Sequence, residues 1–305
     1  MTGGRGAARI LDGMSDSPEA RVPSPLAELS DERFASGGVR LWLKRDDLIH
    51  PELPGNKWRK LKHNLADARA GGHRTLLTFG GAYSNHIRAT AAAGALYGFA
   101  TIGVVRGDEL ADRPLNPSLA FAAARGMRLV FVDRGTYRRR AEPAFATELA
   151  AAHGDFFLLP EGGSNAAAVR GCAELPAEID VDHHVVAVAC GTGGTLAGIA
   201  AGLAPGRTAL GVAVLKGGFL SGEVTALQRA AYGRATANWR VEDDFHHGGY
   251  ARTTPELRTF VEDFRARHGV ALDETYVGKL LYALTALAER GAFAPGTGIV
   301  AVKTG

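Results

Sequence analysis

The length, composition and charge of the chain are those of a globular protein: it has 305 residues, 46% of them hydrophobic and 22% charged, with a formal net charge of +3. The small, scattered positive excess gives no nucleic-acid-binding surface, no apolar run is long enough to span a bilayer, and the polar N-terminus lacks the apolar region of a secretory signal. The two cysteines imply neither a disulfide framework nor a metal site, so we expect a cytoplasmic protein that binds neither nucleic acid nor membrane.

Strands and helices alternate along the chain after a polar segment of about 20 residues, which we expect to be flexible. In a first series we expect strands at 39–43, 75–79, 101–105, 128–132 and 156–159, and helices at 58–70, 86–97, 117–124 and 141–152. In a second series we expect helices at 166–179, 196–203, 255–267 and 278–289, and strands at 184–189, 209–214 and 298–303. This alternation predicts an α/β fold with parallel sheets flanked by helices, in two lobes with a cleft between them.

The glycine-rich loop Gly191–Thr195 follows an apolar strand and opens a helix. Glycines let backbone N–H groups turn toward an anion, and the helix N-terminus adds partial positive charge, so the loop suits a phosphate. It lacks the Gly-Lys-Ser/Thr ending of triphosphate loops and the Gly-x-Gly-x-x-Gly spacing of NAD sites. A tight turn without a ligand is the alternative.

The segment Gly55–Lys62 places three lysines and an arginine at the start of a helix. Cations are disfavoured at the positive end of the helix dipole, so a lysine held there without a carboxylate partner would have a depressed pKa. A nucleophilic lysine that forms a Schiff base needs such a pKa. The alternative is a solvated basic helix.

The loop Gly80–His86 ends one strand and begins the next helix with small residues and side-chain donors. Its backbone N–H groups and the Ser84 hydroxyl are suited to hold a substrate carboxylate. An N-cap at Ser84 or Asn85 is the structural alternative, and both interpretations are compatible.

Six segments in this order resemble one family. They are Leu43–Asp47 (LKRDD), Gly55–Leu61 (GNKWRKL), Ser84–His86 (SNH), Pro160–Asn165 (PEGGSN), Gly191–Thr195 (GTGGT) and Tyr276–Lys279 (YVGK). The chain resembles the fold type II pyridoxal 5′-phosphate (PLP) enzymes, specifically the D-cysteine desulfhydrase and 1-aminocyclopropane-1-carboxylate (ACC) deaminase family. The resemblance implies a two-lobed fold like that of the tryptophan synthase β subunit. Residues 1–61 and 166–305 would form the large PLP-binding domain, and residues 62–165 a small inserted α/β domain.

The resemblance also implies a role for each matching residue. Lys57 would be the Schiff-base lysine and would remove the α-proton. Asn85 would bind the phenolic oxygen of the cofactor, and Tyr250 and Tyr276 would fall on two active-site tyrosines. The phosphate would be held by Gly191, Thr192, Gly193, Gly194 and Thr195. The substrate, a small amino acid, would be bound by Tyr83, Ser84, Asn85 and His86. The family further implies a homodimer.

Departures from the family pattern favour one chemistry over another. ACC deaminases have a glutamate facing the pyridine nitrogen where this chain has Val277, and the ending Lys303-Thr304-Gly305 matches the desulfhydrases, so Thr304 would contact the ring nitrogen. A neutral partner makes a weaker electron sink, which suits β-elimination to a 2-oxo acid and ammonia better than cyclopropane opening.

Three alternatives to the desulfhydrase-like reaction stay open. The first is an ACC deaminase-type ring opening. The second is a specialised biosynthetic PLP enzyme that catalyses elimination, replacement or racemisation, since Tyr83 is bulkier than the usual residue. The third is a PLP-binding protein without turnover. We expect no metal, because the adjacent pairs His183-His184 and His246-His247 would point to opposite faces of a strand.

Overall fold

The computed structural model describes residues 20–304 as parts of two compact units. The smaller unit contains Lys57–Ala168, and the larger contains Arg21–Asn56 and Val169 onward. The division falls at 56/57 and 168/169, where the sequence suggested 61/62 and 165/166. The expected flexible segment lies almost wholly outside the described residues.

The larger unit is built on a mixed sheet with the strand order β1-β2-β10-β7-β8-β9. The strands are β1 (Leu26–Leu29), β2 (Arg40–Lys44), β7 (Val185–Cys190), β8 (Thr208–Ala213), β9 (Trp239–Glu242) and β10 (Gly298–Val302). All neighbours pair in parallel except β1, which runs antiparallel to β2 at the edge. The carboxyl ends of the parallel strands therefore share one edge of the sheet, where β7 leads into Gly191 and β10 into Thr304.

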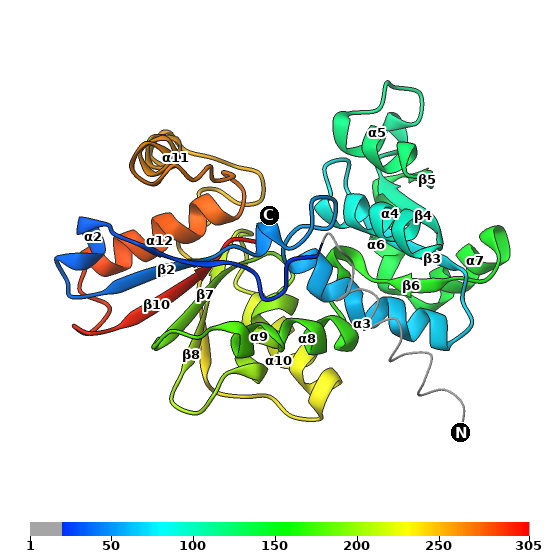
Figure 1. Cartoon of the computed structure of the whole chain (residues 1–305). Helices are drawn as coiled ribbons and strands as arrows, with labels where there is room; N and C mark the ends of the chain where they lie inside the picture. The colour runs from blue at the N-terminus through cyan, green and yellow to red at the C-terminus, as the bar shows by residue number, and fades with distance from the viewer. Residues whose placement is uncertain (1–19, 305) are drawn as a thin grey trace. The chain divides into compact units, whose positions relative to one another are not determined.

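Helices cover both faces of this sheet (Figure 1). They are α2 (Glu32–Ala35), α9 (Gly194–Gly202), α10 (Leu220–Tyr232), α11 (Pro255–His268) and α12 (Val277–Glu289), with short 3-10 turns at Asp46–Leu48 and Leu175–Glu178. Alternate strand residues point to opposite faces, so Leu41 and Leu43 pack with α12 while Trp42 and Val300 pack with α9. These two apolar layers hold in place the edge of the sheet that carries the Gly191–Thr195 loop.

The smaller unit has a parallel sheet with the order β5-β4-β3-β6. Its strands are β3 (Thr75–Gly80), β4 (Ala100–Arg106), β5 (Met127–Val132) and β6 (Phe157–Leu159). Because β3 and β6 are parallel neighbours, the loops that follow them begin at the same edge. These are the loops that carry Ser84 and Gly162.

Helices flank the smaller sheet as well. They are α3 (Asn56–Ala70), which begins at the boundary residue Asn56, α4 (Asn85–Tyr97), α5 (Pro117–Ala124), α6 (Arg134–Arg138) and α7 (Pro143–His153), with 3-10 turns at Asp108–Leu110, Arg139–Ala141 and Glu161–Gly163. Ile87 of α4 and Leu119 of α5 share one apolar cluster, while Tyr137 of α6 and Phe145 of α7 share another. None of the helices in residues 20–304 has the length and apolar character needed to cross a membrane.

The expected elements are present, with one helix shorter than predicted. The helix expected at 166–179 ends as α8 (Ala166–Cys172), and a 3-10 turn containing Pro176 follows. Proline has no N–H to donate, so the α-helical pattern does not continue through it. The sequence interpretation also missed β1, α2, α6, α10 and β9.

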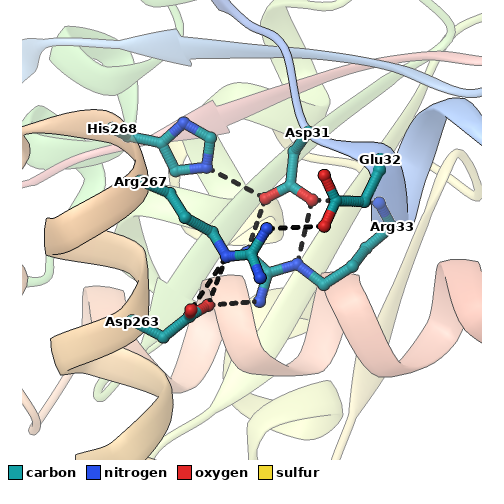
Figure 2. Close-up of polar contacts among 6 residues, drawn as sticks. All are labelled: Asp31, Glu32, Arg33, Asp263, Arg267 and His268. Atoms are coloured by element: carbon teal, nitrogen blue, oxygen red, sulfur yellow. Dashed lines mark hydrogen bonds and ion pairs between the residues drawn. The ribbon is translucent and has the colours of Figure 1, made fainter.

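A network of charges fastens the first helix of the larger unit to α11 (Figure 2). Asp31 caps α2 and accepts hydrogen bonds from Arg33 and from His268 Nε2, the latter at 2.9 Å. Arg33 also pairs with Asp263 at 3.0 Å, and Arg267 pairs with Asp263 at 2.8 Å. The Asp31 side chain is fully buried, so its charge depends on these partners.

Candidate active site

The loop Gly191–Thr195 joins β7 to α9 at the carboxyl edge of the larger sheet. Gly193 is the N-cap of α9 with φ +74°, and no side chain caps the helix there. This φ favours glycine, and the first N–H groups of a helix have no intrahelical partner. The loop therefore presents backbone donors at the positive end of a helix dipole, which is an arrangement suited to a phosphate.

Asn56 links this loop to the lysine of interest. Its Nδ2 donates to Thr195 Oγ1 at 3.0 Å, within the larger unit. Lys57 is the next residue, and Cα atoms joined by a trans peptide are about 3.8 Å apart. Asn56, the residue before Lys57 in the chain, is thus hydrogen-bonded to the Gly191–Thr195 loop.

Gly55 packs against the end of the chain. A Cβ atom at Gly55 would lie 1.6 Å from the carbonyl oxygen of Thr304, and the φ of Gly55 is +62°. Only glycine permits this approach. Thr304 itself is buried.

In the smaller unit, Lys57 and Lys60 converge on one carbonyl group. Lys57 Nζ donates to the Gly162 oxygen at 3.3 Å, and Lys60 Nζ donates to the same oxygen at 3.0 Å and to Ser164 Oγ at 2.9 Å. Lys60 and Arg59 are buried. The alternative of a solvated basic helix is therefore wrong for these two residues.

The loop that offers this carbonyl is held by Glu161. Tyr137 Oη donates to Glu161 Oε1 at 2.7 Å, and Arg140 Nε donates to Glu161 Oε2 at 2.6 Å. Burial raises the pKa of Tyr137, and the hydrogen bond to Glu161 adds to this shift. Tyr137 therefore stays a donor at neutral pH and fixes the residue that precedes Gly162.

Ser84, Asn85 and His86 stand at the start of α4, but their side chains differ in exposure. Ser84 is the N-cap, accepting from Ile87 N at 3.3 Å, as the structural alternative predicted. Asn85 is exposed, and Tyr83 before them is 70% exposed. His86 is buried, and neither of its ring nitrogens has a hydrogen-bond partner in the protein.

The surroundings of His86 keep its imidazole neutral. Burial lowers the pKa of His86 well below its usual value, and Lys57 and Lys60 lower it further. A Cβ atom at Gly163 would lie 2.5 Å from His86 Cε1, so the imidazole packs directly on that glycine. Buried polar atoms without partners are rare in proteins, and these fit a bound polar or anionic group.

Tyr276 and Tyr250 lie together in the larger unit, and Tyr276 lies beside the Gly191–Thr195 loop. A Cβ atom at Gly191 would lie 3.6 Å from Tyr276 Cε1 and 3.8 Å from its hydroxyl. The two tyrosine rings meet edge to face with centroids 6.0 Å apart. Burial raises the pKa of Tyr276, and the neighbouring Tyr250 raises it further, so Tyr276 carries its proton at neutral pH.

Val277, the position where ACC deaminases have a glutamate, is fully buried in the apolar core of the larger unit. The carboxylate of Asp273 accepts the backbone N–H groups of Thr275, Tyr276 and Val277 at 3.0, 2.6 and 3.1 Å. This carboxylate is thus engaged in capping the turn before α12. Val277 itself offers neither a charge nor a hydrogen bond.

These residues fit PLP as a cofactor. The N-terminus of α9 is uncapped by side chains, as a phosphate site requires, and Lys57 follows directly on the residue that anchors this loop. In the smaller unit the unpartnered His86 lies near Lys57 and Lys60, which is suited to a carboxylate. Among residues 20–304 no three His, Cys, Asp or Glu side chains gather as metal ligands would.

Sequence reasoning missed several residues of this arrangement. It assigned no separate role to Asn56, Lys60, Glu161 or Gly162, although all four fall within the matching motifs. Their partners are distant in sequence, since Gly162 lies 105 residues after Lys57 and Thr195 139 after Asn56. The motifs marked these residues, but only the fold shows what they contact.

Comparisons with known proteins agree with this geometry. Residues 19–305 match the family described as pyridoxal-phosphate dependent enzyme. A putative ACC deaminase of Pyrococcus furiosus is 32% identical over 88% of this chain and 85% of its own length. A D-cysteine desulfhydrase of Salmonella paratyphi B is 32% identical over 81% of this chain and 80% of its own.

Two further proteins extend the comparison to a bifunctional relative and to solved structures. The bifunctional D-cysteine desulfhydrase/ACC deaminase of Arabidopsis thaliana mitochondria is 30% identical over 87% of this chain and 71% of its own. The crystal structure of an ACC deaminase homologue superposes with a TM-score of 0.81 and 27% identity, over 97% of this chain and 94% of that one. The chain therefore belongs to the family of pyridoxal-phosphate dependent enzymes and has their α/β fold of parallel sheets flanked by helices.

Proposed function

We propose that this enzyme is a lyase that eliminates a β substituent from a small amino acid, in the manner of a D-cysteine desulfhydrase, and releases a 2-oxo acid and ammonia. Relatives named for this reaction cover most of the chain. The chemistry requires a lysine, an anchor for the cofactor phosphate, a carboxylate-binding group and a proton donor for the leaving group. The candidate residues supply one of each.

Lys57 is proposed to hold the cofactor and to remove the α-proton with its Nζ amine. The Gly162 carbonyl, 3.3 Å away, is an acceptor that can keep this amine in place when it is protonated. Gly191, Thr192, Gly193, Gly194 and Thr195 are proposed to bind the phosphate. Thr304, buried beside Gly55, is proposed to meet the ring nitrogen with a neutral hydroxyl.

Ser84, Asn85 and His86 are proposed to bind the cofactor oxygen and the substrate carboxylate, with Tyr83 at the edge of the substrate site. A neutral imidazole has one donor and one acceptor nitrogen, so His86 can donate to a carboxylate without adding a charge. Tyr276 and Tyr250 are proposed to orient the substrate, and Tyr250 to protonate the departing sulfur. The raised pKa of Tyr276 keeps its hydroxyl neutral, so this group can donate a hydrogen bond to the substrate.

The observation that carries the choice of reaction is Val277. Bound PLP supplies the electron sink for the charge left at the α-carbon. A carboxylate would keep the ring nitrogen protonated and strengthen that sink. Val277 is buried and apolar, and the nearby Asp273 carboxylate is occupied by backbone donors. This environment favours rapid loss of a good leaving group over ring opening.

Ring opening of ACC is the second candidate, because several relatives carry that name. The two candidates give different products. β-Elimination converts D-cysteine and water into pyruvate, ammonia and hydrogen sulfide, whereas ACC and water give 2-oxobutyrate and ammonia. A specialised biosynthetic reaction and a PLP-binding protein without turnover are the remaining possibilities.

The test is product identification with the purified enzyme and PLP, using D-cysteine, L-cysteine, β-chloroalanine and ACC as substrates. We expect pyruvate from a cysteine or from β-chloroalanine and no more than traces of 2-oxobutyrate from ACC. The Lys57→Ala variant is the control and should form neither product. Robust 2-oxobutyrate formation would overturn the argument from Val277, and silence with all four substrates would favour a different substrate or a non-catalytic role.

On the family resemblance we also propose a cytoplasmic homodimer. Analytical ultracentrifugation of the purified protein tests the dimer: a single species of twice the mass of the 32.0 kDa chain is expected, and a monomer would contradict it.

A further inference from the structure

Lys279, in the first turn of α12, is a fully buried lysine to which the proposed reaction assigns no role. Its Nζ donates to two backbone oxygens of one loop, His246 O at 2.8 Å and Gly249 O at 2.7 Å. Both bonds lie within the larger unit. A buried ammonium is costly unless it is hydrogen-bonded, so this lysine is placed to hold the loop.

The loop that Lys279 holds has an unfavourable backbone. His247 and Ala251 have φ of +49° and +54°, and Gly248 and Gly249 between them have φ of +91° and +117°. Residues with a Cβ atom rarely adopt the left-handed region, so two of them within five positions mark a conformation that its surroundings must maintain. The two hydrogen bonds from Lys279 are such a constraint.

Other groups around Lys279 favour the same arrangement. Burial lowers the pKa of Lys279, while the Asp273 carboxylate, which caps the turn before α12, acts in the opposite direction and favours the charged form. The His247 ring packs edge-on against Tyr282 at 4.7 Å, and its Nδ1 lies 3.0 Å from Thr254 Oγ1. The loop is therefore held from α12 and from the start of α11.

This loop presents Tyr250, the residue directly after Gly249. The Tyr250 ring meets the ring of Tyr276, which is the N-cap of α12 and lies three residues before Lys279. The first turn of α12 thus places Tyr276 directly, and it places Tyr250 through the two carbonyls that Lys279 binds. Tyr250 is 44% exposed, so packing alone constrains its side chain weakly.

We propose that Lys279 is a positioning residue that fixes the loop His246–Ala251 and thereby aims the Tyr250 hydroxyl at the leaving group. The role of Tyr250 rests on the proposed function above, whereas the anchoring of the loop does not. The two parts are therefore tested by separate measurements.

The anchoring is tested by hydrogen–deuterium exchange on the protein without added substrate. Lys279→Met keeps the length of the side chain and removes the donor. Amides of residues 246–251 should exchange about 10- to 100-fold faster, the factor expected when hydrogen bonds to a charged donor are lost. Lys44→Met is the matched control: Lys44 is a fully buried lysine of the same unit that donates to Ser24 O and Glu178 Oε2, so its loss should leave these amides unchanged. Unchanged exchange at 246–251 in Lys279→Met would overturn the proposal.

The aim of Tyr250 is tested by comparing leaving groups. A thiol has a pKa of about 8.5 and leaves faster when protonated, whereas chloride needs no proton. Lys279→Met and Tyr250→Phe should each lower kcat with D-cysteine about 100-fold, which is a loss typical of general acid catalysis. Both variants should lower kcat with β-chloro-D-alanine far less. The double variant should be no slower than either single one, and Lys279→Arg should restore part of the rate.

Equal losses of kcat with both substrates would overturn the positioning role, because a purely structural defect does not distinguish leaving groups. If the wild type eliminates neither substituent, the proposed function fails, and the exchange measurement still decides the anchoring. Should Lys279→Met not fold, Lys279→Gln retains a neutral donor on a shorter stem and is expected to give intermediate exchange at 246–251. Exchange at the wild-type rate in that variant would count against the proposal.

Discussion

A single methyl group at Gly163 is expected to disturb the contact between His86 and the Glu161–Asn165 loop. The φ of Gly163 is +67°, and a Cβ atom built there would lie 2.5 Å from His86 Cε1 and 2.9 Å from Nδ1. The left-handed backbone costs about 1–2 kcal/mol for a residue with a side chain. Forcing the buried imidazole to move adds about 1–3 kcal/mol, as overpacking in a core does. Gly163→Ala should therefore lower the free energy of unfolding by about 2–5 kcal/mol.

The matched control is Gly126→Ala in the same unit. Gly126 has φ +80° and no atom within 4 Å of a built Cβ, so this variant should lose only the backbone cost of about 1–2 kcal/mol. Urea unfolding of both variants measures the difference, and the KM for the amino acid reports whether His86 has moved. Equal losses of stability in the two variants, with an unchanged KM in Gly163→Ala, would show that a side chain at residue 163 does not displace His86.

Three further predictions concern the Gly191–Thr195 loop, Asp31 and Tyr137. Gly193→Asp should abolish the retention of PLP through gel filtration, because a carboxylate would face the phosphate at a residue with φ +74°. The control Gly206→Asp, at φ +81° with open space around it, should retain the cofactor. Asp31→Asn keeps the N-cap but removes a buried charge, so stability at pH 7 should fall by about 1–3 kcal/mol by urea unfolding. Burial alone would raise the pKa of Asp31, but hydrogen bonds from Arg33 and His268 outweigh burial and hold the pKa below its usual value. The loss of stability in Asp31→Asn should therefore persist above about pH 4 and shrink as the pH falls further. A loss of stability that grows with acidity would contradict this. Tyr137→Phe removes the 2.7 Å bond to Glu161 while Arg140 remains, so the loss of stability should be about 1 kcal/mol, and an unchanged unfolding midpoint would show that the hydroxyl does not hold Glu161.

Local signals in the sequence were sufficient for much of the fold. The helix Pro117–Ala124 was predicted with its observed bounds, because Asn116 caps it and proline occupies its first turn. By contrast, α10 was missed. Its buried residues are Leu220, Val224 and Gln228, and the last of these is polar. Gln228 is buried because it bonds to Ala197 O and Thr236 N, which lie outside the helix.

The edge strand β1 was missed for a related reason. Leu26–Leu29 has an intermediate-exposed-exposed-intermediate pattern of burial, without the alternation that marks a half-buried strand. Its structure follows from antiparallel pairing with β2, from Leu26 opposite Lys44 to Leu29 opposite Leu41. Short segments of this kind are decided by the neighbour they pair with.

The sequence marked the segments of the candidate site but not the contacts among their residues. Motifs pointed to Lys57, the Gly191 loop and Ser84–His86, because glycines and donors at strand ends have a local meaning. Two arrangements depend on contacts over 30 to 105 residues: the sharing of the Gly162 carbonyl by Lys57 and Lys60, and the hydrogen bonds from Lys279 to the Tyr250 loop. The burial of His86 could not be predicted either, because histidine is intermediate in its tendency to be buried.

We propose that Lys57, and neither of the lysines that follow it on α3, carries the cofactor. Borohydride reduction of the PLP-loaded enzyme fixes the cofactor permanently to the lysine that holds it, and peptide mass spectrometry then locates the modified residue. We expect the added mass on Lys57 alone, and no added mass in Lys57→Ala. Modification of Lys60 or Lys62 in the wild type, or an undiminished adduct in Lys57→Ala, would contradict it.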